Sequence, residues 1–339
     1  AEANLRAAIA LLQPQRLEFD LARAELLLTA LLYQQHLPEA QALWQETATR
    51  IVQNGFAFLV EQERQLAYPL INDGLKSSYA RVVEASNTLM EYLQRAQPLP
   101  MGIKTMGGWH IQCGEHQVDD TTLKTRRAGE LLGLLLIAPG RSLSHEQISE
   151  SLWSSKNPSS AQALLHQASS ALRRALEPDL PEKFPSRYLR VEEGRIALIL
   201  PPGSEVDYEL FERYIKQANW ESALAIYQGD FLPEYRYADW CAAQREWLRQ
   251  DYQTALLMMA RRWLAEDRFR DALEACHKVL AIEPWQEKAV LLGMQAFIGI
   301  GNIAGALRLY QTLEKTLQEE LGVKPQAELQ AYYQTLLNK

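Results

Sequence analysis

The chain has 339 residues, a formal net charge of −7 and 47% hydrophobic residues, which is ordinary for a soluble protein of two or three domains. Its three cysteines form no C-x-x-C pair, which excludes a disulfide framework and the usual zinc motifs and favours a reducing cytoplasm. Residues 101–202 hold 12 basic and 11 acidic groups, whereas both flanking regions are acidic. DNA binding would therefore depend on locally placed arginines rather than on overall charge.

The N-terminus lacks both an initiator Met and the basic start and apolar run of a signal peptide. We therefore expect a cytoplasmic fragment of a larger protein. The longest apolar window, residues 289–307, contains Gln295, Asn302 and several glycines. It predicts a buried helix pair rather than a membrane span.

Residues 1–97 have a helical pattern almost throughout. Two antiparallel helices are predicted, joined near Gln35–Pro38. The small and large residues from Ala40 to Thr47 have the spacing of tetratricopeptide-like (TPR-like) helix pairs. The region ends in a Pro/Gly linker, Gln97–Gly102.

The periodicity then changes, and residues 103–120 predict two or three short strands with turns at Gly107-Gly108 and Gly114-Glu115. The next predicted helix begins with three cations, Lys124, Arg126 and Arg127. Cations at a helix start oppose the helix dipole, and a phosphate partner would offset that cost. A chance basic cluster is the alternative.

Two further helices follow. Ser144 and Gln147 form a capping box that starts the first of them. The second follows Pro158, with Ser159 or Ser160 as its N-cap. Its apolar stripe consists of Ala161, Leu165, Ala168, Leu172 and Leu176. A second stripe, at three- and four-residue spacing, consists of Ala163, His166, Gln167, Ser170, Arg173 and Arg174.

The second stripe has the chemistry of a DNA-reading face. Gln167 can pair bidentately with adenine, His166 and Ser170 can bond base edges, and Ala163 can touch a thymine methyl. Arg173 and Arg174 suit phosphates. An ordinary solvated polar face is the alternative, but the position of the stripe after a capped helix and before a hairpin favours DNA reading.

A β-hairpin is predicted over residues 188–200. Three arginines, Arg187, Arg190 and Arg195, flank its turn at Glu192-Glu193-Gly194. Three short helices followed by a hairpin make a winged helix, whose third helix can enter a major groove. The two glutamates at the tip disfavour close approach of this wing to DNA.

Residues 205–339 are again helical and contain a repeat. Asp267, Phe269, Ala272 and Cys276 recur 34 residues later as Gly301, Ile303, Ala306 and Tyr310. This is the tetratricopeptide period, and a weaker unit lies at Asn219–Tyr227. Such helix pairs stack because they cannot bury their apolar faces alone.

No catalytic constellation is found. The chain has no phosphate-binding G-x-x-x-x-G-K-[ST] loop and no G-x-G-x-x-G, and its six histidines lack metal-ligand spacing. We therefore expect neither an enzyme nor a bound cofactor or metal in this region.

The stretch TRRAGELLGLLLIAPGRSLSHEQISESLW, followed by ALRRAL, resembles the response-regulator-type winged helix of SARP-class regulators. VDYELFERYI, YQGDFLPEY and EELGVKPQAEL resemble the bacterial transcriptional activator domain that follows it, so the likeness covers about residues 101–339. FAFLVEQERQLAYPLINDGL resembles the helical arm of large ATP-dependent STAND regulators related to the maltose-regulon activator. That resemblance implies an NTPase domain upstream.

The resemblance also implies roles for individual residues. The family's basic helix entry falls on Arg126 and Arg127, although Gly129 and Glu130 depart from its pattern, and its backbone-contacting arginine falls on Arg173. Its base-reading positions fall on Ala163, Leu164, His166, Gln167, Ser170 and Ala171.

We predict a mainly α protein in which TPR-like helical domains flank a winged helix-turn-helix. The predicted domains are a helical domain (1–97), a winged helix (98–204) and a transcriptional activator domain (205–339). The expected function is sequence-specific activation of transcription on double-stranded promoter DNA. RNA polymerase and a second copy of the chain are the expected partners, the membrane is not, and any small-molecule effector is unidentified. The alternative is a protein-interaction scaffold that does not read DNA.

Overall fold

The computed structural model describes residues 1–95, 98–114, 116–178 and 184–338, without the side chains of Asp120 and Arg126. The chain divides into two compact units. The first comprises Ala1–Leu99 and Ser170–Glu192, and the second comprises Pro100–Ser169 and Glu193–Lys339. The division therefore runs through one helix and one hairpin of the predicted winged-helix region.

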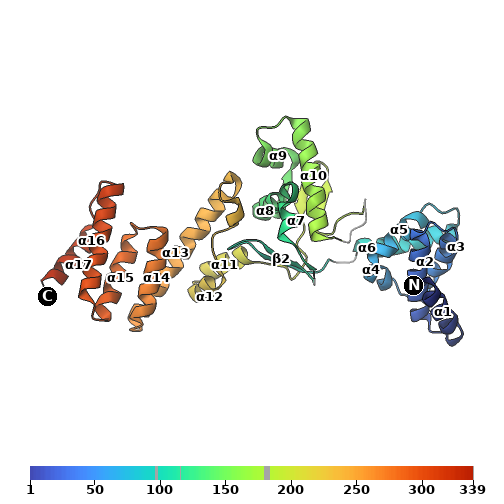
Figure 1. The fold of residues 1–339 in the computed structure, drawn as a ribbon, viewed down its shortest axis with the longest axis horizontal. Helices are drawn as coiled ribbons and strands as arrows, with labels where there is room; N and C mark the ends of the chain where they lie inside the picture. The colour runs from blue at the N-terminus through green and yellow to red at the C-terminus, as the bar shows by residue number, and fades with distance from the viewer. Residues whose placement is uncertain (96–97, 115, 179–183, 339) are drawn as a thin grey trace. The chain divides into compact units, whose positions relative to one another are not determined.

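The first unit is built mainly from six helices at the N-terminus (Figure 1). They are α1 (Glu2–Leu12), α2 (Glu18–Gln34), α3 (Glu39–Gln53), α4 (Phe58–Gln62), α5 (Arg64–Gly74) and α6 (Ala80–Arg95). The predicted joint near Gln35–Pro38 is confirmed, because α2 ends and α3 begins on either side of it. Trp44, Ile51, Ile71 and Leu89 lie in one apolar core, which also contains Phe184 from the distant segment 170–192.

A small mixed sheet opens the second unit. Its strands are β1 (Met101–Lys104), β2 (His110–Cys113), β3 (His116–Gln117) and β7 (Glu205–Val206), in the order β3-β2-β1-β7. β1 and β2 are antiparallel, with Met101 opposite Cys113, and burial alternates along both strands. The prediction of two or three short strands is confirmed, although β1 already begins at Met101, inside the expected linker. Of the expected turn and linker residues, Glu115 and Gln97 lie outside the described residues.

The parallel strand β7 was not predicted. Val206 pairs with Ile103 of β1, and the next residue, Asp207, begins the C-terminal helices. The sheet thus joins the region before the winged helix to the region after it.

The winged-helix region has the predicted helices and hairpin, but the first predicted helix is divided in two and the strand β4 was not predicted. Its helices are α7 (Asp120–Lys124), α8 (Ala128–Ile137), α9 (His145–Trp153) and α10 (Pro158–Leu176). Its strands are β4 (Ser142–Ser144), β5 (Leu189–Glu192) and β6 (Arg195–Leu198), in the sheet order β4-β6-β5. The hairpin turn is confirmed, since Glu193 (φ 47°) and Gly194 (φ 74°) both have the positive φ of a two-residue hairpin turn.

The starts of α9 and α10 are fixed by different caps. The capping box of α9 is confirmed, because Ser144 Oγ accepts from Gln147 N while Gln147 Oε1 accepts from Ser144 N. The predicted cap of α10 is wrong. Asn157 caps this helix, since its Oδ1 accepts from Ser160 N at 2.8 Å and from Ser159 Oγ at 3.0 Å. Pro158 occupies the first helical position, where its missing N–H costs nothing.

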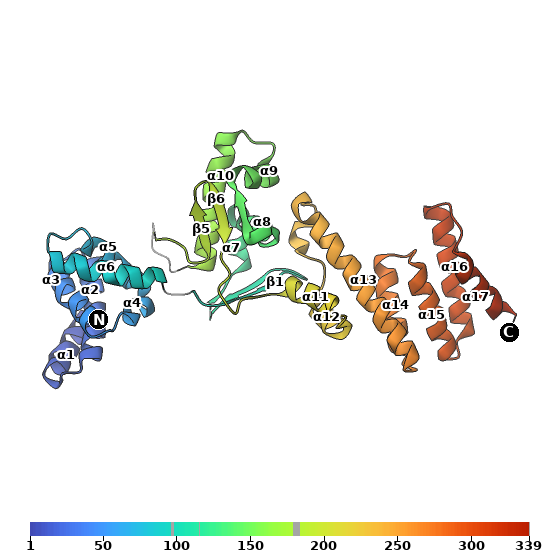
Figure 2. The same cartoon turned by 180° about the vertical axis from the view of Figure 1, so that it is seen from behind.

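The C-terminal helices lie side by side in chain order from α13 to α17 in both views (Figures 1 and 2). The helices of this region are α11 (Asp207–Lys216), α12 (Trp220–Ile226), α13 (Ala242–Ala265), α14 (Phe269–Ile282), α15 (Glu287–Gly299), α16 (Ile303–Glu320) and α17 (Ala327–Leu337). The repeat is visible in the backbone, because Asp267 (φ 56°) and Gly301 (φ 77°) turn the chain at equivalent points before α14 and α16. The mainly α fold with TPR-like helix pairs is confirmed.

One carboxylate ties the small sheet to the first C-terminal helix. Asp207 accepts from Thr105 N at 2.8 Å, Thr105 Oγ1 at 2.6 Å and Met106 N at 2.9 Å. Leu232 N donates to Thr105 O, and Gly107 N donates to Asp230 O. These bonds make the small sheet and the C-terminal helices parts of one unit.

Candidate nucleic-acid interface

One side of α10 is exposed along most of the helix. The exposed residues are Ser159, Ser160, Gln162, Ala163, His166, Gln167, Ser170 and Arg174. The opposite side is buried and includes Leu165, Ala168 and Leu172. The sequence prediction of two distinct stripes is therefore confirmed, whereas the role of the polar stripe in DNA binding stays a prediction.

The exposed residues supply the donors and acceptors that base edges require. Gln167 presents an amide, which can both donate and accept, and His166 and Ser170 extend the polar surface on either side of it. Ala163 leaves space for a methyl group. Ala171, a position that the SARP resemblance assigned to base reading, is only 4% exposed and lies on the buried side.

The two arginines at the end of α10 have different surroundings. Arg174 is exposed and is the cation that this face presents to solvent. Arg173 is half-buried, and its Nη2 donates to the Phe184 carbonyl. Its Nε is buried without a hydrogen-bond partner among the described residues. Arg173 thus holds the chain that follows α10 and is less available to phosphate than Arg174.

The predicted cation cluster is not at the start of one helix. Lys124 is exposed and lies in the last turn of α7, where a positive charge is favourable to the helix dipole. Arg127 is the left-handed residue that precedes α8, and its guanidinium donates to the Leu152 carbonyl and lies 3.5 Å from Glu130. The side chain of Arg126 lies outside the described residues. The expectation failed because a break at residues 125–127 divides the predicted helix in two.

The arginines near the wing are not equivalent either. Arg195 is exposed and donates to the Oγ and carbonyl of Ser142. Arg190 is exposed beside Glu192 at 3.7 Å. Arg187 is held by two carboxylates, with Nη1 2.5 Å from Glu61 and Nε 3.0 Å from Glu177. Arg195 is thus the more available cation for a phosphate backbone.

The sequence analysis missed the anchoring of the segment between α10 and β5. Phe184 is 1% exposed, packs edge-on against Tyr68 with ring centroids 4.0 Å apart, and lies under the Arg64 guanidinium at 4.3 Å. Glu177 is 7% exposed and accepts from Ser186 Oγ and Arg187 N. The only sequence signal is a lone Phe in a polar, Pro-containing stretch, which does not identify its partners.

Among the described residues, no group of three or more His, Cys, Asp or Glu side chains is placed to hold a metal ion. None of the helices in the described part of the chain combines the length and apolar character that a membrane span needs.

Comparison with known proteins assigns the C-terminal region. Residues 210–337 match the family described as "Bacterial transcriptional activator domain". The regulatory protein AfsR of Streptomyces coelicolor is 27% identical over 217 residues, covering 61% of this chain and 21% of that protein. AfsR of Streptomyces griseus is 27% identical over 215 residues, covering 61% and 22%. The chain thus spans about a fifth of the length of these relatives.

A solved structure shares the fold. The structure of Mycobacterium tuberculosis EmbR in complex with a low-affinity phosphopeptide superposes with a TM-score of 0.56 at 20% identity, covering 72% of this chain and 66% of that chain. Residues 210–337 therefore match the bacterial transcriptional activator domain, and the arrangement of a winged helix and a helical domain is a fold shared with the EmbR structure.

Proposed function

We propose that the chain activates transcription by placing the exposed face of α10 in the major groove of promoter DNA. The observation that carries the proposal is the polar face of His166, Gln167 and Ser170, which is exposed and ends in the solvent-facing Arg174. Specific reading then comes from the amide, imidazole and hydroxyl groups. Arg174, Lys124 and Arg195 supply backbone contacts, which position the protein without reading sequence.

The C-terminal helices are proposed to make the protein contacts of an activator. Tyr237 is 91% exposed and Trp247 is 62% exposed, although large aromatic side chains are usually at least half covered. A surface of this kind suits RNA polymerase or a second copy of the chain. The proposed contacts with RNA polymerase and with a second copy of the chain do not depend on the upstream NTPase that we expect from the STAND resemblance.

A scaffold without DNA binding is the second candidate. The exposed Glu192 and Glu193 at the wing tip and the net charge of −7 favour protein partners over phosphate. In that case, the same face of α10 would bind a protein.

The experiment is fluorescence anisotropy of the chain with sheared genomic DNA at two salt concentrations, followed by sequencing of the retained fragments. Salt-dependent binding and an enriched repeat are expected. Gln167→Ala should weaken binding to the enriched sequence by about 1–3 kcal/mol and leave non-specific binding unchanged. Arg174→Ala should weaken binding to all sequences and reduce the salt slope by about one.

Two matched controls lie far along the chain. Gln334 on α17 and Arg308 on α16 are exposed and form no side-chain hydrogen bond or ion pair with any described residue. Gln334→Ala and Arg308→Ala should therefore leave DNA binding unchanged. Equal binding by wild type and Arg174→Ala, at every salt concentration, would favour the scaffold.

A further inference from the structure

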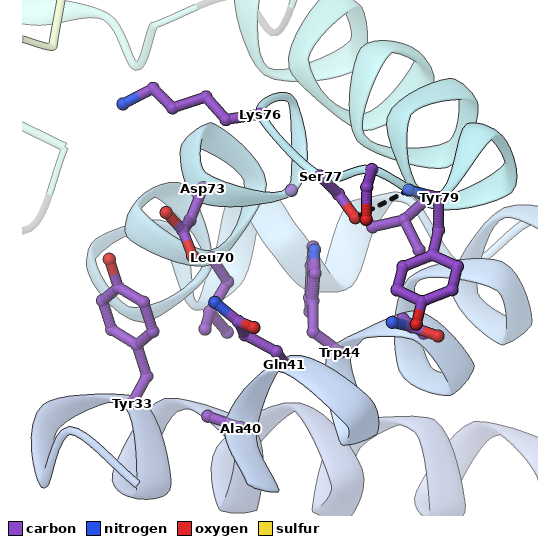
Figure 3. A pocket seen from close by; sticks show the side chains of 13 residues that line it. Tyr33, Ala40, Gln41, Trp44, Leu70, Asp73, Lys76, Ser77 and Tyr79 are labelled. Atoms are coloured by element: carbon purple, nitrogen blue, oxygen red, sulfur yellow. Dashed lines mark hydrogen bonds between the residues drawn. The ribbon is translucent and has the colours of Figure 1, made fainter. Parts of the chain in front are cut away.

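The N-terminal helices enclose a pocket of about 320 Å³, which is the size of a small-molecule site (Figure 3). Its walls come from the end of α2, from α3, from the end of α5 and from the loop before α6. All the lining residues belong to the first compact unit.

Trp44 lines this pocket and carries a buried hydrogen-bond donor without a partner among the described residues. The residue is 3% exposed, and its indole Nε1 has no hydrogen-bond partner among the described residues. Figure 3 shows this nitrogen directed toward the segment that carries Asp73 and Ser77. A buried N–H without an acceptor costs about 1–3 kcal/mol.

A glycine lets the Trp44 indole pack close to α5. Gly74 lies within α5, where glycine is not needed for the backbone conformation. A Cβ at this position would lie 2.6 Å from Trp44 Nε1 and would collide with Ser86 Oγ. Ser86 Oγ is itself buried without a partner in the described structure. Two polar atoms without partners in the described structure, Trp44 Nε1 and Ser86 Oγ, therefore both pack against Gly74.

The pocket is also lined by two opposite charges. Neither Asp73 nor Lys76 forms an ion pair with another side chain that the structure describes. Figure 3 shows the Asp73 carboxylate and the Tyr33 hydroxyl facing each other, with Lys76 extending outward. Burial, and then the negative charge of Asp73, raise the pKa of the Tyr33 hydroxyl. A carboxylate thus lies on one side of the pocket and an ammonium group at its rim.

We propose that the pocket binds a small zwitterion of the amino-acid type. Its ammonium group pairs with Asp73 and lies near the aromatic ring of Tyr33, which favours a cation. Its carboxylate accepts from the Ser77 hydroxyl, within the field of Lys76. A simple anion would be repelled by Asp73, and a neutral polyol would leave both charges unused. The proposed ligand binding does not rest on the proposed DNA binding.

Ligand-observed saturation-transfer NMR on the full 339-residue chain tests the site, with the twenty protein amino acids in mixtures and D-glucose as the polyol. Isothermal titration then gives the Kd of each amino acid that binds. For each amino acid that binds, two analogues are compared: the amine that lacks its carboxyl group and the carboxylic acid that lacks its amino group. Each analogue should bind at least tenfold more weakly than the amino acid. D-glucose should not bind.

Variants locate the site. Asp73→Asn should weaken binding at least tenfold, and Lys76→Ala two- to fivefold. Glu84→Gln removes an exposed carboxylate from α6 in the same unit and should change nothing. Thermal melting checks that each variant is folded, and Lys76 is exposed, so its removal leaves the core intact.

Three results would overturn the proposal. One is the absence of binding by all twenty amino acids. Another is that Asp73→Asn and Lys76→Ala both bind as strongly as wild type. The third is binding of D-glucose that exceeds that of every amino acid.

Discussion

Arg187, on the segment that leads into β5, donates from Nη1 to Oε1 of Glu61 on α4 over 2.5 Å. The same carboxylate lies 2.9 Å from Arg64. Burial, and then the charge of Arg187, lower the pKa of the Arg64 guanidinium, so Glu61 offsets the repulsion between two neighbouring arginines. A cation predicted to bind DNA is thus part of an ion-pair network inside the first unit.

Glu61→Gln should lower the free energy of unfolding by about 1–3 kcal/mol, because it leaves two partly buried arginines facing each other. It should also make Arg187 more available to phosphate and steepen the salt dependence of DNA binding. Urea denaturation and anisotropy measure the two effects. Glu91→Gln is the control, since Glu91 forms an exposed pair with Arg95 that contributes little. An unchanged salt slope would show that Arg187 does not reach DNA even when released.

Phe184→Ala should destabilise the first unit by about 3–4 kcal/mol, because it removes a fully buried ring from the core. Urea denaturation followed by tryptophan fluorescence measures the loss, since Trp44 reports on this core. Val191→Ala is a matched control in the same unit, because Val191 is 47% exposed. A loss below about 1 kcal/mol would mean that the ring is not anchored in solution.

Asp207→Ala should cost about 2–4 kcal/mol, because it deprives the N–H groups of Thr105, Met106 and Tyr208 of a charged acceptor. Differential scanning calorimetry measures the change. Asp239→Ala removes an exposed carboxylate from the same unit and should cost little. If both variants melted at the wild-type temperature, the proposed link between the sheet and the C-terminal helices would be wrong.

The three cysteines should be unreactive in the folded protein, since all are buried. Burial raises the pKa of the Cys276 thiol to about 12 and also raises that of Cys241. A raised thiol pKa keeps the group protonated at every pH below that value, and the protonated thiol is a poor nucleophile. Ellman's reagent at pH 7.5 should report no thiol before denaturation and all three afterwards. Ala331→Cys, at an exposed site on α17, should add one thiol that reacts at once.

The sequence predicted the features that depend on near neighbours in the chain. The capping box at Ser144, the hairpin turn at Gly194 and the 34-residue repeat all follow from local spacing. It did not predict the pairing of β7 with β1, because that contact joins residues about a hundred positions apart. Asn157 was missed as the cap of α10 because two serines after Pro158 have the same capping chemistry.

The candidate DNA face was predictable for a similar reason. Helical periodicity alone separates Gln167 and Ser170 from the buried Leu165 and Leu172. Periodicity could not separate Arg173 from Arg174, since they are adjacent and the difference depends on the distant carbonyl of Phe184.

Helix α5 joins the residues that contact Phe184 to residues that line the pocket. Its 11 residues form a rod about 16 Å long. Arg64 and Tyr68 of its first half contact Phe184, whereas Asp73 and Gly74 at its other end line the pocket. If the proposed ligand shifts this helix, it also moves Arg64 and Tyr68, which hold the segment between α10 and the wing. If this in turn changes the affinity for DNA, then DNA binding must change the affinity for the ligand by the same factor.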